Sequence, residues 1–283
     1  MSAHFFQTAA RSAIGLVRQG NEDSAFVSAQ LIAVADGMGG HAAGEVASKI
    51  AVQVLQKLTP TLVAKDIDED SISDLLMHSL HSIDEEIAAV TDEDLEKRGM
   101  GTTLTALLIR DKQAALLHVG DSRCYRLRGN TLEQLSNDHT VIQELLDQGA
   151  ISQAEAAEHP QRSMLTQALR GDGDVTPVLQ VYEVKNGDRF LLCSDGLSGV
   201  LTEKEIKIGL KKSDKDEAVK FLVDATYVNG APDNVTVLIA DISSDEVSTS
   251  QLLGAAHDQS AAWWSLQTWR DDRHRRYGRC LCC

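Results

Sequence analysis

Three aspartates of the chain stand where an apolar run ends beside a glycine. They are Asp36 in VADGMGGHAAGE, Asp121 in LLHVGDS and Asp195 in FLLCSDG, and a fourth, Asp233 in GAPDN, lies just before the last apolar run. An Asp-Gly pair alone is typical of a plain turn. Because strand ends bring distant residues together, the four aspartates together predict a cluster of carboxylates.

A cluster of this kind predicts a site for divalent cations. Two carboxylates about 4 Å apart repel by roughly 4 kcal/mol at an effective dielectric of about 20, so the cluster persists if cations fill it. Ligands that are all oxygen favour Mg²⁺ or Mn²⁺, and glycines let backbone and water approach an ion without a Cβ in the way. No His or Cys pair has zinc-site spacing. Two-metal carboxylate sites typically hydrolyse phosphoesters through a hydroxide that bridges the ions.

Such a site also needs a cation for the phosphate oxygens, preferably a planar guanidinium. The candidate is Arg18 in GLVRQGNED, with Asp23 five residues later. An isolated arginine is more often a solvated surface residue, so this interpretation depends on the aspartates as well.

The composition limits the partners and the compartment. The 283 residues are 43% hydrophobic and carry a formal net charge of −15, which suits a globular protein and disfavours nucleic acid or an anionic membrane surface as the main partner. No apolar run is long enough for a membrane span and no signal peptide opens the chain, so we expect a cytoplasmic location. The spacing of the five cysteines is not that of a disulfide framework.

The strands that must position the aspartates follow one another on short turns. Hairpin turns are predicted at Asp111 and Lys112 and at Gly129 and Asn130. The clearest hairpin pattern is LQVYEVKNGDRFLLCSDG, with Asn186-Gly187 at its tip. Consecutive strands on such turns imply antiparallel sheets.

Helices should cover these sheets. Apolar residues at helical spacing predict helices over residues 45–58, 71–90 and 214–227. The combination predicts an α+β domain of layered sheets and helices.

Two further segments have a different character. Residues 141–173 read as two short helices and loops inserted between strands, which is either a lid beside a site or a plain surface excursion. After the catalytic region, residues 1–242, a polar segment leads to three tryptophans and the basic, cysteine-rich end RDDRHRRYGRCLCC. We expect residues 243–283 to be a mostly disordered tail, the alternative being a juxtamembrane basic patch with lipidatable cysteines.

Six segments together carry a resemblance to a known family. GLVRQGNED, VADGMGGHAAGE, GMGTTLTAL, HVGDSRCYRLR, LCSDGL and GAPDNVTVLI occur in this order. The chain resembles the bacterial type 2C metal-dependent serine/threonine protein phosphatases (PPM family) over about residues 9–242. The insertion resembles their flap segment. The resemblance implies a four-layer α-β-β-α sandwich, in which two antiparallel sheets are flanked by helix pairs.

The resemblance also implies a set of metal ligands. Asp36 should bridge two ions, with the carbonyl of Gly37 on one of them. Asp195 and Asp233 should hold the other ion, and Asp23 should bind metal-bound water. Two tightly bound Mn²⁺ or Mg²⁺ ions are therefore expected. Asn234, Thr102 and Thr103 are expected to support these ligands by hydrogen bonds.

The resemblance implies further roles, for two of which an alternative is open. Arg18 resembles the phosphate-binding arginine. Asp121 resembles the ligand of a third, weaker ion shared with Asp195; alternatively it only accepts a hydrogen bond from the adjacent Ser-Arg. Many eukaryotic members carry a histidine where this chain has Met38. His41 is the nearest histidine, and it either protonates the leaving alcohol or only caps a helix or packs; a metal-bound water could serve instead.

The implied function is hydrolysis of phosphoserine and phosphothreonine in proteins by a metal-bridging hydroxide, and the expected role is to oppose serine/threonine kinases. Phosphoproteins, including such kinases and their substrates, are the expected partners, and a monomer is expected. The alternative is a catalytically weak relative that binds phosphoproteins as a regulator. A cysteine phosphatase is disfavoured because neither Cys124 nor Cys193 has an arginine six positions on.

Overall fold

The computed structural model describes residues 4–39, 43–64 and 68–243, and all of them belong to one compact unit, Met1–Asp245. His41 and the predicted tail after Ser243 lie outside the described residues.

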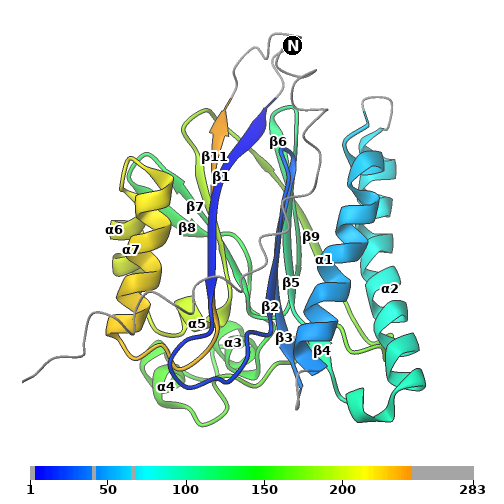
Figure 1. Cartoon of the computed structure of the whole chain (residues 1–283). Coiled ribbons are helices and arrows are strands. Elements are labelled where there is room, and N and C mark those ends of the chain that lie inside the picture. Colours follow the sequence, from blue (N-terminus) through cyan, green and yellow to red (C-terminus); the bar gives the residue numbers. More distant parts are fainter. Residues whose placement is uncertain (1–3, 40–42, 65–67, 244–283) are drawn as a thin grey trace, which may run out of the picture. The chain divides into compact units, whose positions relative to one another are not determined.

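Two antiparallel sheets form the centre of this unit (Figure 1). The first sheet has five strands in the order β1-β11-β10-β7-β8, and the second has the order β2-β3-β5-β6-β9, with β4 paired to β3. The strand bounds of the first sheet are β1 Phe5–Ala13, β11 Val235–Ser243, β10 Arg189–Cys193, β7 Arg123–Arg128 and β8 Thr131–Gln134. Those of the second are β2 Asp23–Val27, β3 Leu31–Met38, β4 Gly101–Thr102, β5 Leu104–Arg110, β6 Gln113–Val119 and β9 Val178–Glu183.

Helix pairs cover the outer faces of both sheets (Figure 1). Helices α1 (Ala43–Leu62) and α2 (Glu69–Glu93) lie against the second sheet, and α6 (Glu203–Leu210) and α7 (Lys215–Val228) lie against the first. The four-layer α+β sandwich is therefore confirmed, and the three predicted helices are present with longer bounds or shifted ends. The shorter helices are the 3₁₀ turn Leu95–Lys97, α3 Val141–Asp147, α4 Gln153–Glu158 and α5 Asp195–Ser198.

The position of β3 between two layers explains why its first five residues, 31–35, are all apolar. Leu31, Ala33 and Ala35 pack into the cluster beneath α1 and α2, whereas Ile32 and Val34 pack into the cluster between the two sheets. Because successive side chains of a strand point to opposite faces, a strand buried on both faces needs a continuous apolar run. The run ends at Asp36, where the strand reaches the end of the sandwich.

One predicted hairpin is wrong. Strands β9 and β10 flank the turn at Asn186-Gly187, but β9 pairs with β6 and β10 pairs with β7 and β11, so the turn leads from one sheet to the other. A turn pattern reports only the local reversal of the chain. The pairing is decided by burial: β10 is buried along its whole length and needs a neighbour on each side. The hairpins at Asp111 and at Gly129 are present.

The insertion does contain two short helices, α3 and α4. Leu165 bridges Thr140 next to α3, and the far end of the insertion returns to the second sheet, where Leu169 bridges Thr102 of β4. The loop from Leu169 to β9 therefore runs along the end of the second sheet where β3 stops.

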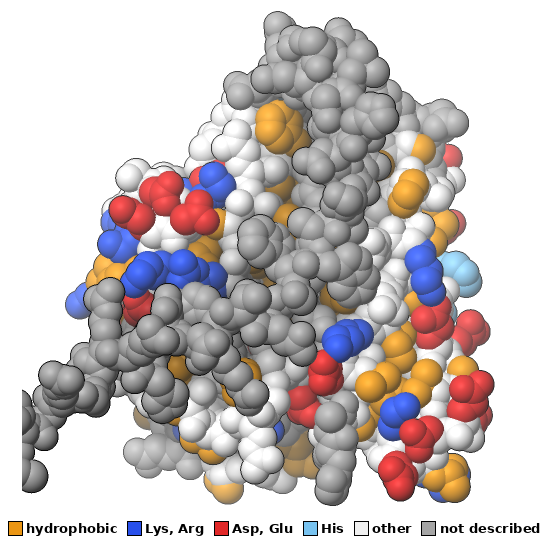
Figure 2. Space-filling view, in the orientation of Figure 1, with side chains coloured by type: hydrophobic (Ala, Val, Ile, Leu, Met, Phe, Trp, Pro, Cys, Tyr) orange, Lys and Arg blue, Asp and Glu red, His pale blue; other side chains and the backbone are white. Residues whose placement is uncertain are grey.

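Charged side chains of both signs are interspersed over the helix layers on the face seen in Figure 2. Lys57 of α1, for example, pairs with Glu86 of α2 at 3.1 Å. Within the described ranges, no helix is both long and apolar enough for a membrane span.

Candidate metal centre

The structure brings four of the predicted aspartates to one cleft. Asp36 lies near the end of β3, Asp121 follows β6, Asp195 begins α5 after β10, and Asp233 precedes β11. All four line a cleft of about 570 Å³ at one end of the two sheets. The other residues of its lining are Arg18, Glu22, Gly37, Met38, Gly39, Thr103, Ser163, Leu165 and Arg170.

The carboxylates in this cleft raise one another's pKa. Burial is the largest cause of the raised pKa of Asp36, followed by the charges of Asp23 and Asp195. Burial and the charge of Asp195 raise the pKa of Asp121 to about 7. The pKa of Asp195 is also raised, first by burial and then by the charge of Asp233. The protein thus holds several negative charges where they destabilise each other.

Asp23 lies behind the cleft, directly opposite Asp36 in the β2–β3 pair. Its Oδ2 accepts hydrogen bonds from Thr236 Oγ1 at 2.6 Å and from Ser194 Oγ at 2.8 Å. Its Oδ1 is buried and has no partner among the described residues. Burial raises the pKa of Asp23 to about 6. A buried acceptor without a donor costs folding free energy. A bound water or another donor from outside the protein would remove this cost.

These residues fit hydrated Mn²⁺ or Mg²⁺. In the parts of the chain that the structure describes, no three acidic, histidine or cysteine side chains form a ready-made metal cluster. Ions that keep several waters need only one or two carboxylates each, and a hydrated ion would supply both the positive charge that the aspartates lack and a donor for Asp23 Oδ1. The donor set consists of oxygen atoms, as these hard ions require.

Arg18 lies at the rim of the cleft, in the loop between β1 and β2. Its Nη2 donates to Asp233 Oδ2 at 2.7 Å, and this hydrogen bond raises the pKa of the guanidinium. The side chain of Asn234 ties the same loop to β11, because its Nδ2 donates to the carbonyls of Ile14 and Gly20 at 2.9 Å each. The sequence neighbours Asp233 and Asn234 thus position Arg18 together.

Two threonines fix the backbone of Asp36. Thr103 donates its N–H to the Asp36 carbonyl at 2.9 Å and accepts from the Asp36 N–H with its Oγ1 at 3.0 Å, and Thr102 Oγ1 also donates to that carbonyl. Gly37 is required for a reason other than ion access. A Cβ there would lie 2.1 Å from the carbonyl oxygen of Gly44, so the glycine lets α1 start against β3.

Asp121 follows Gly120, whose φ of +106° favours glycine. The side chains next to Asp121 have other partners: Ser122 Oγ contacts Thr103 Oγ1 at 2.9 Å, and Arg123 donates to both carboxylate oxygens of Asp138. The side chains of the adjacent Ser-Arg are therefore engaged without Asp121. Its role as a ligand of a third ion remains a prediction.

Sequence reasoning missed several residues of the cleft. Glu22 directly precedes Asp23 in the motif GNED, so it could have been found from that motif. Arg170 gave no signal, because it lies in a glycine-rich loop whose place beside β4 depends on tertiary contacts.

Comparisons with known proteins agree with this fold. The family model "Protein phosphatase 2C" matches residues 16–230. The chain is 44% identical over 237 residues to "Serine/threonine protein phosphatase PstP" of Mycobacterium tuberculosis, covering 83% of this chain and 44% of that protein. It is 36% identical over 238 residues to "Serine/threonine phosphatase stp" of Listeria welshimeri, covering 80% of this chain and 92% of that one.

Solved structures are similar as well. The crystal structure of the M. tuberculosis phosphatase PstP has a TM-score of 0.79 at 43% identity, covering 84% of this chain and 98% of that one. The catalytic domain of a PstP in complex with two manganese ions has a TM-score of 0.77 at 40% identity, covering 84% and 99%. The chain spans less than half the length of full PstP. With the family model matched over most of its length, the chain belongs to the protein phosphatase 2C family.

Proposed function

We propose that this chain is a metal-dependent protein phosphatase that hydrolyses phosphoserine and phosphothreonine in proteins. The observation that carries the proposal is the acidic cleft, in which Asp36 faces the partly unsatisfied Asp23 while Arg18 stands at the rim. The catalytic region is residues 1–242.

Bound Mn²⁺ or Mg²⁺ would supply an activated water and positive charge for the phosphoryl oxygens. Asp36 and the carbonyl of Gly37, with Asp195 and Asp233, would hold two ions. Asp23 would act through its free Oδ1, accepting a hydrogen bond that orients a water towards the substrate. Asp121 would complete a weaker third site with Asp195, as two carboxylates with several waters make a loose site.

Arg18 would bind and orient the phosphoryl group. Its present partner is Asp233, and both side chains are substantially exposed, at 51% and 30%. Exposed ion pairs contribute only about 0–1 kcal/mol, so a dianionic phosphoryl group can replace Asp233 at little cost. The leaving alcohol needs a proton, which His41 or a water would donate; Met38, in the cleft, has no proton to give.

Phosphoproteins, among them serine/threonine kinases and their substrates, would be the partners of a monomeric enzyme. The second candidate, a catalytically weak regulator that binds phosphoproteins, is less favoured because such a protein has no need of the repelling carboxylates, and all of them are present.

A phosphopeptide assay separates the two candidates. We expect turnover with Mn²⁺ that a chelator abolishes and that added Mn²⁺ restores, while Asp36→Asn stays inactive. Tight phosphopeptide binding without turnover under any metal condition would instead support the regulator.

A further inference from the structure

Two arginines line the cleft, and they stand on opposite sides of β3. Arg18 precedes β2, whereas Arg170 follows Leu169, which exchanges backbone hydrogen bonds of 2.9 Å with Thr102 in β4. Strand β3 pairs with β2 along one edge and with β4 along the other. The two arginines therefore reach the cleft from segments on the two edges of β3.

The two arginines differ in what they contact. Arg18 is paired with Asp233. Arg170 is exposed, and none of the ion pairs formed within the described ranges includes it; its Nη2 lies 3.9 Å from Met38 Sδ. An exposed guanidinium at the rim of an acidic cleft, engaged by a thioether and not by a carboxylate, is free to bind an anion.

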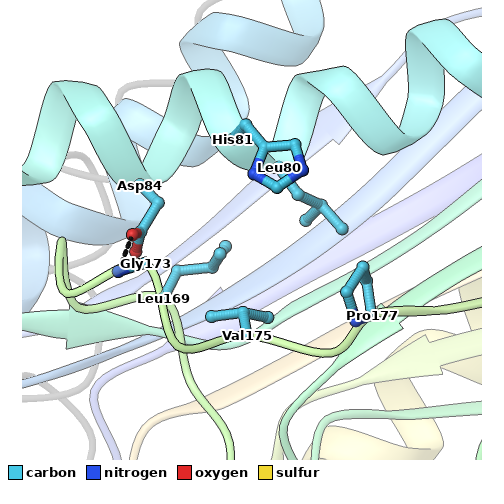
Figure 3. Close-up of a pocket in the computed structure, with 7 residues that line it drawn as sticks. All are labelled: Leu80, His81, Asp84, Leu169, Gly173, Val175 and Pro177. Atoms are coloured by element: carbon cyan, nitrogen blue, oxygen red, sulfur yellow. Dashed lines mark hydrogen bonds between the residues drawn. The ribbon is translucent and has the colours of Figure 1, made fainter.

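The loop that carries Arg170 is firmly held. Buried Asp84 of α2 accepts hydrogen bonds from the N–H groups of Arg170 at 3.0 Å and of Gly171 and Gly173 at 2.7 Å each. In Figure 3, Asp84 points from the helix to the backbone of Gly173, and the adjoining cavity measures only about 10 Å³.

Glycine is required at one position of this loop. Gly171 has φ +79°, and a Cβ there would lie 2.7 Å from the backbone nitrogen of Ala88. Only glycine lets the loop approach α2 so closely. The backbone at Arg170 is thus fixed before any ligand binds, which lowers the ordering cost of binding.

The Arg170 side chain is confined as well. A Cβ on Gly101 would lie 2.9 Å from Arg170 Cγ, so the stem of the arginine runs close over β4. With Arg18 assigned to the reacting phosphoryl group, Arg170 is left to meet a neighbouring part of the substrate. Its planar fork suits a carboxylate or a phosphoryl group.

We propose that Arg170 is a specificity residue that binds an anionic group next to the phosphorylated residue of a protein substrate. That group is an acidic side chain or a second phosphoryl group. The inference rests on the proposed phosphatase function and names the substrate class of the same site.

The test compares matched phosphothreonine peptides with the Mn²⁺-loaded full chain. One position at a time, within two residues on either side of the phosphothreonine, carries Gln, Glu or a second phosphothreonine. At one of these positions an anionic peptide should be the better substrate. We expect kcat/KM for the Glu peptide, for the doubly phosphorylated peptide or for both to exceed that for the Gln peptide by about tenfold, because one charge-assisted contact contributes about that much. Which of the two is preferred identifies the source of the anion.

Arg170→Gln should remove this preference while leaving kcat/KM unchanged for the Gln peptides and for p-nitrophenyl phosphate, which has no flanking group. The matched control is Arg162→Gln, which alters an exposed arginine of the insertion that does not line the cleft; it should keep the preference.

Three results would overturn this inference while leaving the proposed function standing. In the first, the wild-type enzyme shows no anion preference at any position. In the second, Arg170→Gln keeps the preference. In the third, Arg170→Gln loses as much activity on p-nitrophenyl phosphate as on the preferred anionic peptide. A chain that hydrolyses none of the substrates with Mn²⁺ overturns the proposed function and this inference together, whereas an active chain without preference overturns this inference alone.

Discussion

The carboxylate of Asp36 destabilises the fold unless a cation lies beside it. Without one, burial and the neighbouring aspartates raise its pKa, which means that holding it ionised at neutral pH costs folding free energy. The sequence motifs indicate both Asp36 and Asp23. They do not show that the two lie opposite each other in the β2–β3 pair, where the charge of Asp23 adds to the cost of ionising Asp36.

Substitution of Asp36 by Asn should therefore have opposite effects on stability and activity. In chelator at pH 7, Asp36→Asn should melt at a higher temperature than the wild type, because one buried charge is gone. With Mn²⁺ the wild type should gain stability by ligand binding and the variant much less, and phosphopeptide turnover should fall at least about 100-fold.

Scanning calorimetry with and without Mn²⁺ checks the stability, and steady-state kinetics check the activity. The control is Asp92→Asn, which changes an exposed aspartate of α2. An Asp36→Asn variant that turns over phosphopeptide near the wild-type rate would show that the metal centre lies elsewhere.

Arg18 offers a second test at the same scale. Arg18→Ala should lower kcat/KM for phosphopeptide by roughly 10- to 100-fold, mostly through a higher KM, because a charge-assisted contact to the phosphoryl group is lost. The exposed Arg11 of β1 provides the control, since Arg11→Ala should leave kinetics unchanged. Equal kcat/KM for the Arg18 variant and the wild type would remove Arg18 from the site.

Between the elements, a buried histidine joins β5 and β6 to the loop that follows β8. His118 Nδ1 lies 3.0 Å from Thr105 Oγ1, and its Nε2 lies 3.0 Å from the Asn137 carbonyl. Across its ring lies His139, whose Nδ1 accepts the N–H of Gly120 at 3.1 Å. Burial and the charge of His139 lower the pKa of His118 to about 3.

This histidine should make stability fall with acid. The folded-state pKa lies below the usual value of about 6.5, so the unfolded chain binds the proton more readily. The full contribution is present above about pH 6.5 and is lost progressively as the pH falls towards 3. Urea unfolding between pH 7 and pH 4 should therefore show a steeper loss of unfolding free energy for the wild type than for His118→Asn.

The exposed His81 of α2 supplies the matched control, and His81→Asn should keep the wild-type slope. If His118→Asn, although less stable overall, shows the same slope as the wild type, the buried histidine does not titrate as described.

At this scale the limits of sequence reasoning are physical. Helix positions and the ends of apolar runs are local properties, and they identified α1, α2, α7 and the aspartates. The partner of β10 is a non-local property, so the local pattern at Asn186-Gly187 predicts a hairpin that the fold does not form. The position of Arg170 in the cleft could not be predicted from the sequence for the same reason, because it is set by Asp84, 86 residues earlier in the chain.

For the whole molecule, the boundary of the catalytic domain remains a prediction. Every segment that lines the cleft precedes the end of β11 at Ser243. A chain that ends at Ser244 should keep full activity on a soluble phosphopeptide with Mn²⁺, compared with the full chain under the same conditions. A large loss of kcat on truncation would move the boundary towards the C-terminus.

The cleft takes its carboxylates from both sheets: Asp36 lies in β3 and Asp121 follows β6, both of the second sheet, and Asp195 and Asp233 adjoin strands of the first. Any sliding of one sheet over the other would pull these groups apart. Ions held between them would therefore fasten the two layers, and breathing motions that open the sandwich would be coupled to ion loss. Amide protons of β3 and β10 should then exchange with solvent more slowly as the concentration of divalent cations rises.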